Sequence, residues 1–169
     1  MLALSLTLFD IVRLRKGPDA IPYSWIVCLL VLTIWLLASY AISLSTETMD
    51  DEDFLNSTFT GVVGLACYAA IVVSSGRTPR LLQTVTAILG CGALISILYL
   101  VETFAFGALL GEPLTALIGM LIVLWSVPVE GHIIARAIDR NWYIGIVVAM
   151  AVFILQWFLY AYLTTDTAA

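Results

Sequence analysis

The sequence contains little charge for its length, and this shortage excludes most soluble folds. Only 11% of its 169 residues are charged, whereas about 25% are charged in an ordinary soluble domain. Its hydrophobic share is 62%, above the usual range of about 45–50%. The mean hydropathy of +1.07 therefore indicates a polytopic membrane protein, most of which is surrounded by lipid.

The residue types that carry most enzyme chemistry are also scarce. There are one histidine and three cysteines, without a C-x-x-C pair, a metal triad or a glycine-rich phosphate loop. Cys28, Cys67 and Cys91 all lie inside apolar runs, which predicts small buried side chains rather than disulfides. We therefore expect no enzymatic activity, no catalytic or cofactor-binding residues, and no metal site or cofactor.

Long apolar runs dominate the rest of the chain. About 20 helical residues cross the ~30 Å hydrocarbon core of a bilayer. The runs predict an all-α protein with a single membrane domain over 1–169 and five spans, at about 22–44, 57–75, 81–102, 113–134 and 142–163.

Two of these spans contain features that modify a simple helix. The third run continues to Leu110, and we expect its helix to end near Glu102, with residues 103–110 folded back at the outer interface. Pro128 lies inside the fourth span and leaves the carbonyl of Leu124 without a backbone donor, which predicts a kink.

The first 16 residues are too short to span a membrane. Leu2, Leu6, Phe9 and Val12 recur at helical spacing, which predicts an amphipathic helix lying in the interface. The Gly-Pro pair at 17–18 should end this helix.

The positions of the seven basic residues predict the orientation. They precede the first span or lie in the loops after the second and fourth spans: Arg13, Arg15, Lys16, Arg77, Arg80, Arg136 and Arg140. A cytoplasmic N-terminus and an outside C-terminus place all seven in the cytoplasm, as the positive-inside rule requires. The acidic stretch at 47–53 then lies outside, either as a solvated loop or as a weak site for Ca²⁺ or Mg²⁺.

The segment VPVEGHIIARAIDRN at 127–141 holds the densest group of polar side chains. Glu130, His132, Arg136 and Asp139 form the candidate interaction site, either for docking or acid–base chemistry, or as an ordinary helix end in the headgroups. We expect Glu130 to pair with Arg77 or Arg80. His132 and Arg136 are expected to face a cytoplasmic partner.

Glu102 is the acidic residue closest to the membrane interior and is the candidate intramembrane polar residue. Two interpretations are open. It is either an interfacial carboxylate that is paired or hydrated, or part of a proton or ion relay.

The five short-looped spans, together with the segment LFDIVRLRKGPDAIPYS before the first, resemble the small bacterial members of the Yip1-like membrane proteins. The vesicle-traffic motif of the eukaryotic members is missing here, so their function is not carried over. The segment GHIIARAIDRNW at 131–142 also resembles the junction between the fourth and fifth spans of proteobacterial inner-membrane proteins. That second resemblance implies no particular activity.

These observations favour a multi-pass protein of a bacterial inner (plasma) membrane that acts by contact, as an assembly factor or organiser of another membrane complex. Its expected partners are the lipid bilayer and another membrane protein or further copies of itself, with no nucleic acid. The alternative is a transporter or channel subunit with a polar path through Glu102, Glu130 and His132.

Overall fold

The computed structural model describes residues 2–45 and 51–166, and within these ranges every regular element is helical. In chain order the elements are α1 (Leu2–Val12), the short 3-10 turn η1 (Pro18–Ala20), α2 (Trp25–Ser45), α3 (Asp51–Ser74), the 3-10 turn η2 (Thr78–Arg80), α4 (Leu81–Leu110), α5 (Glu112–Leu124), α6 (Ser126–Ala137) and α7 (Trp142–Asp166).

Five helical stretches are long and apolar enough to cross a membrane, which confirms the predicted fold class. They are Trp25–Ser45, Glu52–Ser74, Thr78–Gly107, Pro113–Ala137 and Trp142–Thr165. The fourth stretch combines α5 and α6, since only Trp125 separates them. Many large apolar side chains lie on the outside of the bundle, as expected where the surrounding solvent is lipid.

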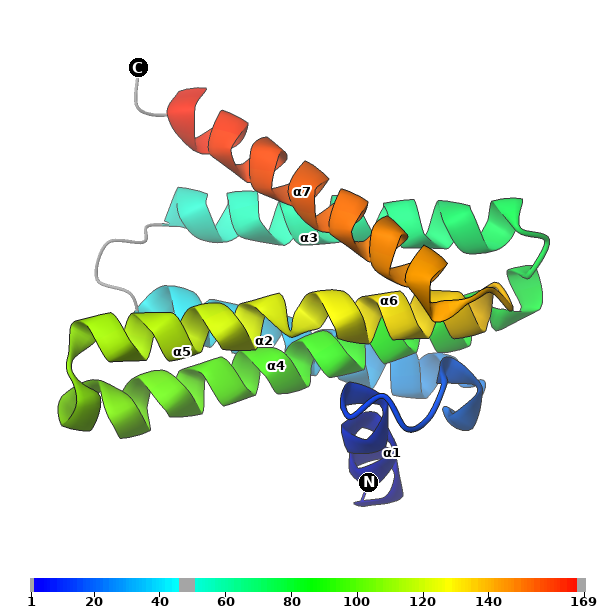
Figure 1. Ribbon diagram of the computed structural model, residues 1–169, viewed down its shortest axis with the longest axis horizontal. Coiled ribbons are helices and arrows are strands. Elements are labelled where there is room, and N and C mark those ends of the chain that lie inside the picture. Colours follow the sequence, from blue (N-terminus) through cyan, green and yellow to red (C-terminus); the bar gives the residue numbers. More distant parts are fainter. Residues whose placement is uncertain (1, 46–50, 167–169) are drawn as a thin grey trace.

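Helix α4 forms the centre of the bundle, and half of the residues in its most apolar 18-residue stretch are buried. The axes of α2, α3, α5 and α6 lie roughly along the axis of α4, whereas α7 crosses the bundle obliquely from α6 towards the far end of α3 (Figure 1). We call the end with the loops at 75–80 and 138–141 the basic end of the bundle.

Helices α6 and α7 touch through two glycines. A Cβ added to Gly131 would lie 2.9 Å from the backbone nitrogen of Ile146, and one added to Gly145 would overlap the carbonyl oxygen of Gly131. Because lipid provides no hydrophobic drive for helix association, such close backbone contact is a main source of packing energy in a membrane. These glycines therefore allow the oblique crossing of α7.

The predicted end of the third span at Glu102 is wrong. Helix α4 continues without a break to Leu110, and residues 103–110 extend the helix instead of folding back. None of the five prolines lies between 81 and 110, so nothing in this stretch interrupts the hydrogen-bond ladder. The chain reverses at Gly111, whose positive φ of 76° suits a residue without a Cβ.

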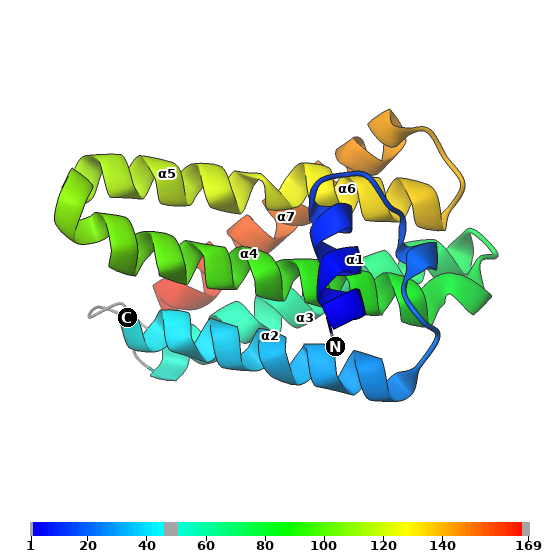
Figure 2. The ribbon, with the colours of Figure 1, turned by 90° about the horizontal axis from the view of Figure 1, so that it is seen from below.

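The fourth span is interrupted close to Pro128. Helix α5 ends at Leu124 and α6 begins at Ser126, four and two residues before the proline. The next backbone bond, from Val129 N to Trp125 O, is long at 3.4 Å. Both ribbon views show α5 and α6 following one line, so the missing N–H interrupts the helix without turning it sharply (Figures 1 and 2).

Helix α1 lies across the bundle rather than along it, and it is packed against α4 and α6 (Figure 2). Leu8 and Ile11 are buried there, whereas Leu6 and Phe9 of the predicted apolar face are exposed. The sequence predicted one apolar face, whereas the helix has two. This helix is apolar on two sides because one side contacts the bundle and the other is left for lipid.

Candidate functional site

Three salt-bridged side chains join the two loops at the basic end. Arg77 binds Oδ2 of Asp139 at 2.8 Å, and Arg80 binds Oδ1 of the same carboxylate at 2.7 Å. Asp139 follows α6 in a left-handed conformation, with φ at 53°. The hydrogen bond from Arg80 and the nearby charge of Arg77 lower the pKa of Asp139 below its usual value.

Arg80 also completes the C-terminus of α6. Its guanidinium donates to the carbonyl oxygens of Arg136 at 3.1 Å and Ala137 at 3.3 Å. The last carbonyls of a helix have no partner within it and carry its negative dipole end, so a guanidinium there is favourable. One arginine from the α3–α4 connection therefore holds both the end of α6 and the residue that follows it.

Glu130 does not pair with either arginine, and that expectation is wrong. Its Oε2 accepts a 2.6 Å hydrogen bond from the hydroxyl of Tyr68 on α3. Glu130 lies seven positions before the end of α6 at Ala137, which places it roughly 10 Å further into the bundle than that helix end at 1.5 Å per helical residue. The loop arginines therefore reach Asp139 and leave Glu130 to a donor inside the membrane span.

A small cavity of about 110 Å³ with a mixed polar and apolar wall lies beside Glu130. Tyr68, Trp35 and Gln156 contribute polar side chains to it, and three glycines on α3 and α4 also line it. Gln156 also donates to the carbonyl of Thr60 at 3.1 Å. At ~30 Å³ for each water molecule, the cavity has room for a few.

His132 faces the N-terminal segment and not a cytoplasmic partner, so this expectation is also wrong. The residue is 8% exposed, and Nε2 donates to the carbonyl oxygen of Lys16 at 3.1 Å. Lys16 in turn binds Asp10 at 2.9 Å, and its ammonium lowers the pKa of that carboxyl. His132 thus fixes the chain that leaves α1, because a buried polar ring needs a partner.

Arg136 is exposed, and it lines a second pocket of about 180 Å³ at the basic end. The pocket is formed by three separate segments of the chain, with Pro18, Asp19, Arg80, Gln83, Arg136 and Asp139 as its lining. Gln83 closes the inner side by donating to the carbonyl of Ile21 at 2.7 Å.

Glu102 is buried in the α4–α5 hairpin and does not lie at an exposed interface. It is 3% exposed, and among the described residues its Oε1 has no hydrogen-bond partner. Gly119 of α5 lies beside it, and a Cβ there would be 2.9 Å from the ring of Tyr99 and in ordinary contact, at 3.5 Å, with Oε2 of Glu102. Neither Glu102 nor His132 lines the cavity beside Glu130, so the structure does not join these three residues in one cavity.

Sequence reasoning missed Tyr68 and Gln156. Each is a polar side chain in the middle of an otherwise apolar run, where an unpaired hydroxyl or amide is costly. That cost could have indicated both residues from the sequence, because each such group needs a hydrogen-bond partner on another helix. Only the packing shows which partner it has.

None of the three cysteines forms a disulfide. Cys28 and Cys91 are buried, Cys67 is half-buried, and all three are free thiols. Within residues 2–45 and 51–166, no group of three His, Cys, Asp or Glu side chains is close enough to share a metal ion. The first part of the acidic stretch, at 47–50, lies outside the described residues. Asp53, its last residue, accepts a 3.3 Å hydrogen bond from Tyr160.

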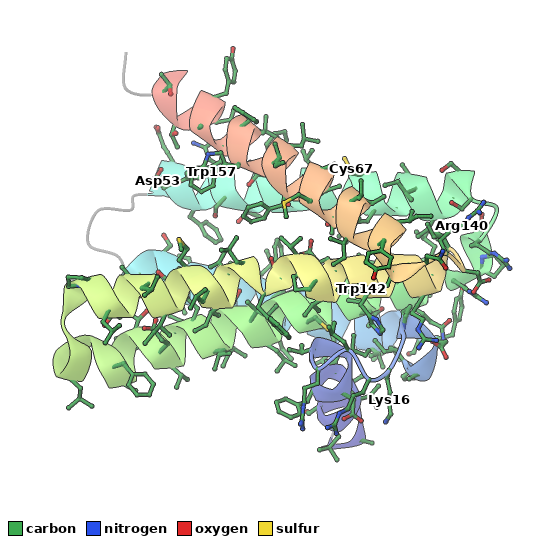
Figure 3. All side chains as sticks on the ribbon, viewed as in Figure 1. Lys16, Asp53, Cys67, Arg140, Trp142 and Trp157 are labelled. Carbon is green, nitrogen blue, oxygen red and sulfur yellow. The ribbon has the colours of Figure 1, made fainter. Side chains whose placement is uncertain are left out.

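The fold and its apolar exterior define a multi-pass helical membrane protein. Arg140 marks the basic end in the side-chain view, and Asp53 lies at the opposite end (Figure 3). Comparison of the chain with protein-family models, curated proteins and solved structures gave no match.

Proposed function

We propose that this protein acts by contact, as an assembly factor or organiser of another membrane complex, and that the partner binds at the basic end. The observation that carries the proposal is the pocket formed by the N-terminal segment, the start of α4 and the end of α6. Arg136 and Asp19 on its rim are exposed and form no ion pair among the described residues. A partner segment with an acidic and a basic side chain would satisfy both.

The proposal also includes the orientation of the protein and the membrane that contains it. The basic residues of both loops gather at one end, which supports a cytoplasmic basic end under the positive-inside rule. We place the chain in a bacterial inner membrane, among proteins resembling the Yip1-like group. In that orientation the pocket opens to the cytoplasm.

Photocrosslinking tests this function directly. A photoreactive amino acid at position 19 should form a crosslink to one membrane protein in intact cells. The same probe at Tyr23, which is 65% exposed and outside the pocket, should not give that crosslink.

A matched pair of substitutions separates partner capture from folding. Arg136→Ala should lose the crosslinked partner while the amount of protein in the membrane stays the same. Arg140→Ala removes another exposed basic residue at the same end, outside the pocket, and should retain it. Retention of the partner by both variants contradicts the proposed site.

The second candidate function is a transporter or channel subunit, and the cavity beside Glu130 favours it. A carboxylate within a membrane span commonly marks an ion or proton pathway. Purified protein in liposomes should then show ion or proton flux that Glu130→Gln abolishes. Flux of this kind together with no crosslinked partner would support this candidate over the first.

A further inference from the structure

The cavity of about 110 Å³ beside Glu130 lies within the membrane-spanning part of the bundle. Tyr68 is six positions before the end of α3 at Ser74, which corresponds to roughly 9 Å at 1.5 Å per helical residue. Glu130 lies at a similar depth, about 10 Å before the end of α6. Five helices, α2, α3, α4, α6 and α7, contribute residues to the wall. The cavity is therefore formed by the packing of most of the bundle.

Hydrogen-bond acceptors outnumber donors among the polar side chains of this wall. Tyr68 gives its hydroxyl proton to Oε2 of Glu130 at 2.6 Å, so towards other groups the phenol oxygen is an acceptor only. Gln156 gives one amide proton to the carbonyl of Thr60 at 3.1 Å. Among the described residues neither Glu130 nor Gln156 has a donor at its Oε1 atom. The donors that remain are the second amide proton of Gln156 and the indole N–H of Trp35. An occupant with several donors would satisfy this wall.

Two aromatic rings and a carboxylate in the same wall also favour a positive charge. The Trp35 indole lies between α3 and α4, because a Cβ on Gly61 would be 3.0 Å from its Cζ2 and one on Gly92 would be 3.4 Å from its Nε1. Tyr68 supplies the second ring. Aromatic rings attract a cation over their faces, and a carboxylate attracts it strongly where water is scarce. The wall thus offers both kinds of contact to a cation.

We infer that this cavity binds a small protonated amine, either ammonium or a short primary alkylammonium, with Glu130 as its counter-ion. Glu130 is the one acidic residue among those described in the wall. A single positive charge therefore leaves the site neutral, whereas a divalent ion would leave a net charge within the span, which is costly.

An amine suits the cavity better than Na⁺ or K⁺ does. Its N–H groups match the free acceptors of Glu130 and Gln156, and a short alkyl group suits the apolar part of the wall, which includes Leu65, Ile88 and Leu89. An amine also has a neutral form that crosses lipid, whereas a metal ion stays charged. Binding here is independent of the pocket at the basic end and of the proposed partner, and it requires no flux.

Thermal unfolding of the purified protein in mild detergent tests the inference. Methylammonium chloride is compared with sodium chloride at the same pH and ionic strength, because a ligand that binds only the folded state raises the melting temperature. Methylammonium should raise the melting temperature of the parent along a saturating curve, and Na⁺ should not. Equal curves for the two salts would overturn the proposal, and so would the lack of any shift with methylammonium.

Two glutamate substitutions identify the counter-ion. Glu130→Gln keeps the shape of the side chain and removes its charge, so the dissociation constant for methylammonium, taken from the same curves, should rise at least about tenfold. Glu102→Gln changes another buried glutamate that does not line the cavity, and it should keep the affinity of the parent. Unchanged affinity in Glu130→Gln would contradict the site, as would an equal loss in both variants.

A comparison of two amines on the parent protein needs no substitution. Benzylammonium has the charge and the N–H donors of methylammonium but carries a benzene ring, and an engineered cavity that holds benzene measures about 150 Å³. The cavity beside Glu130, at about 110 Å³, should therefore exclude it. Benzylammonium is the more apolar of the two amines, so it would bind more tightly to a lipid-facing surface. A shift with benzylammonium as large as that with methylammonium, or larger, would place the binding outside the cavity and overturn the proposal.

Discussion

Tyr68 and Glu130 connect α3 and α6 inside the bundle through a 2.6 Å hydrogen bond between side chains 62 positions apart. The bond places a carboxyl group next to a cavity with room for water, away from the arginines at the basic end. Its energetic importance follows from its surroundings, because a polar group left unpaired in such a place loses its interaction with water without replacement.

Tyr68→Phe should lower the free energy of unfolding by about 1–3 kcal/mol, because it leaves the Glu130 carboxyl without its donor. Unfolding by SDS in mixed micelles measures the change. Tyr143→Phe is the matched control, since this tyrosine is 76% exposed, and it should change the stability little. Equal values for the two variants would show that the bond contributes nothing.

Gly145→Ala should destabilise the protein by about 1–3 kcal/mol, the usual effect of adding a methyl group to a tightly packed contact. The new Cβ would overlap the carbonyl oxygen of Gly131, so α7 would have to move away from α6. Gly107→Ala provides the control, because no atom lies within 4 Å of a Cβ at that position. The same micelle assay compares them, and a neutral Gly145→Ala would rule out the close helix contact.

The ion pairs of Asp139 predict that the stability of the protein falls at acidic pH. Its pKa is lowered in the folded protein, so the stabilising charge is present above its ordinary value of 3.8 and is lost as the pH falls through the folded pKa. The melting temperature of the parent should therefore exceed that of Asp139→Asn at pH 7, and the difference should shrink below about pH 4.

Asparagine suits this experiment because it tolerates the left-handed backbone found at position 139, so that the substitution removes mainly the charge. A difference in melting temperature that stays constant between pH 7 and pH 3 would mean that the arginine pairs do not stabilise the loops.

Topology reporters test the orientation. A reporter that is active only outside the cytoplasm should work when fused after Ala169 or inserted near Asp51. It should fail at Thr78, which lies beside Arg77 and Arg80 at the basic end. Activity at Thr78 would reverse the orientation and would place the pocket at Arg136 outside the cell.

Cysteine labelling tests the packing. In intact membranes, membrane-impermeant maleimides should leave Cys67 and Cys91 unmodified, because Cys91 is 1% exposed and both lie within spans. Arg140→Cys in inside-out vesicles supplies an exposed positive control at the basic end. Rapid labelling of Cys67 would indicate a water-filled path and would favour a transporter.

The candidate site was only partly predictable. The concentration of polar residues in 127–141 indicated where to look, and Arg136 in this segment is exposed. The pairing of Glu130 could not be predicted. A helix places successive side chains on different faces, and the sequence does not say which face meets another helix. Asp139 received the arginines because it follows the end of α6, at the level of the loops.

The ends of the helices were also only partly predictable from the sequence. The reversal at Gly111 depends on local chemistry, and no proline interrupts α4 before it. The expected stop at Glu102 came instead from the assumption that a span is no longer than the membrane is thick. Packing against α5 instead buries Glu102 inside the hairpin, where it is 3% exposed.

The sequence by itself determined the class of this protein, because 62% hydrophobic residues in five long runs can be accommodated only as membrane helices. Tertiary structure alone decided which polar groups meet. Tyr68 with Glu130, and His132 with Lys16, are separated by tens of residues or more along the chain. Periodicity specifies a helix and its faces, whereas the partner of each face depends on how the backbones approach, as at Gly131 and Gly145.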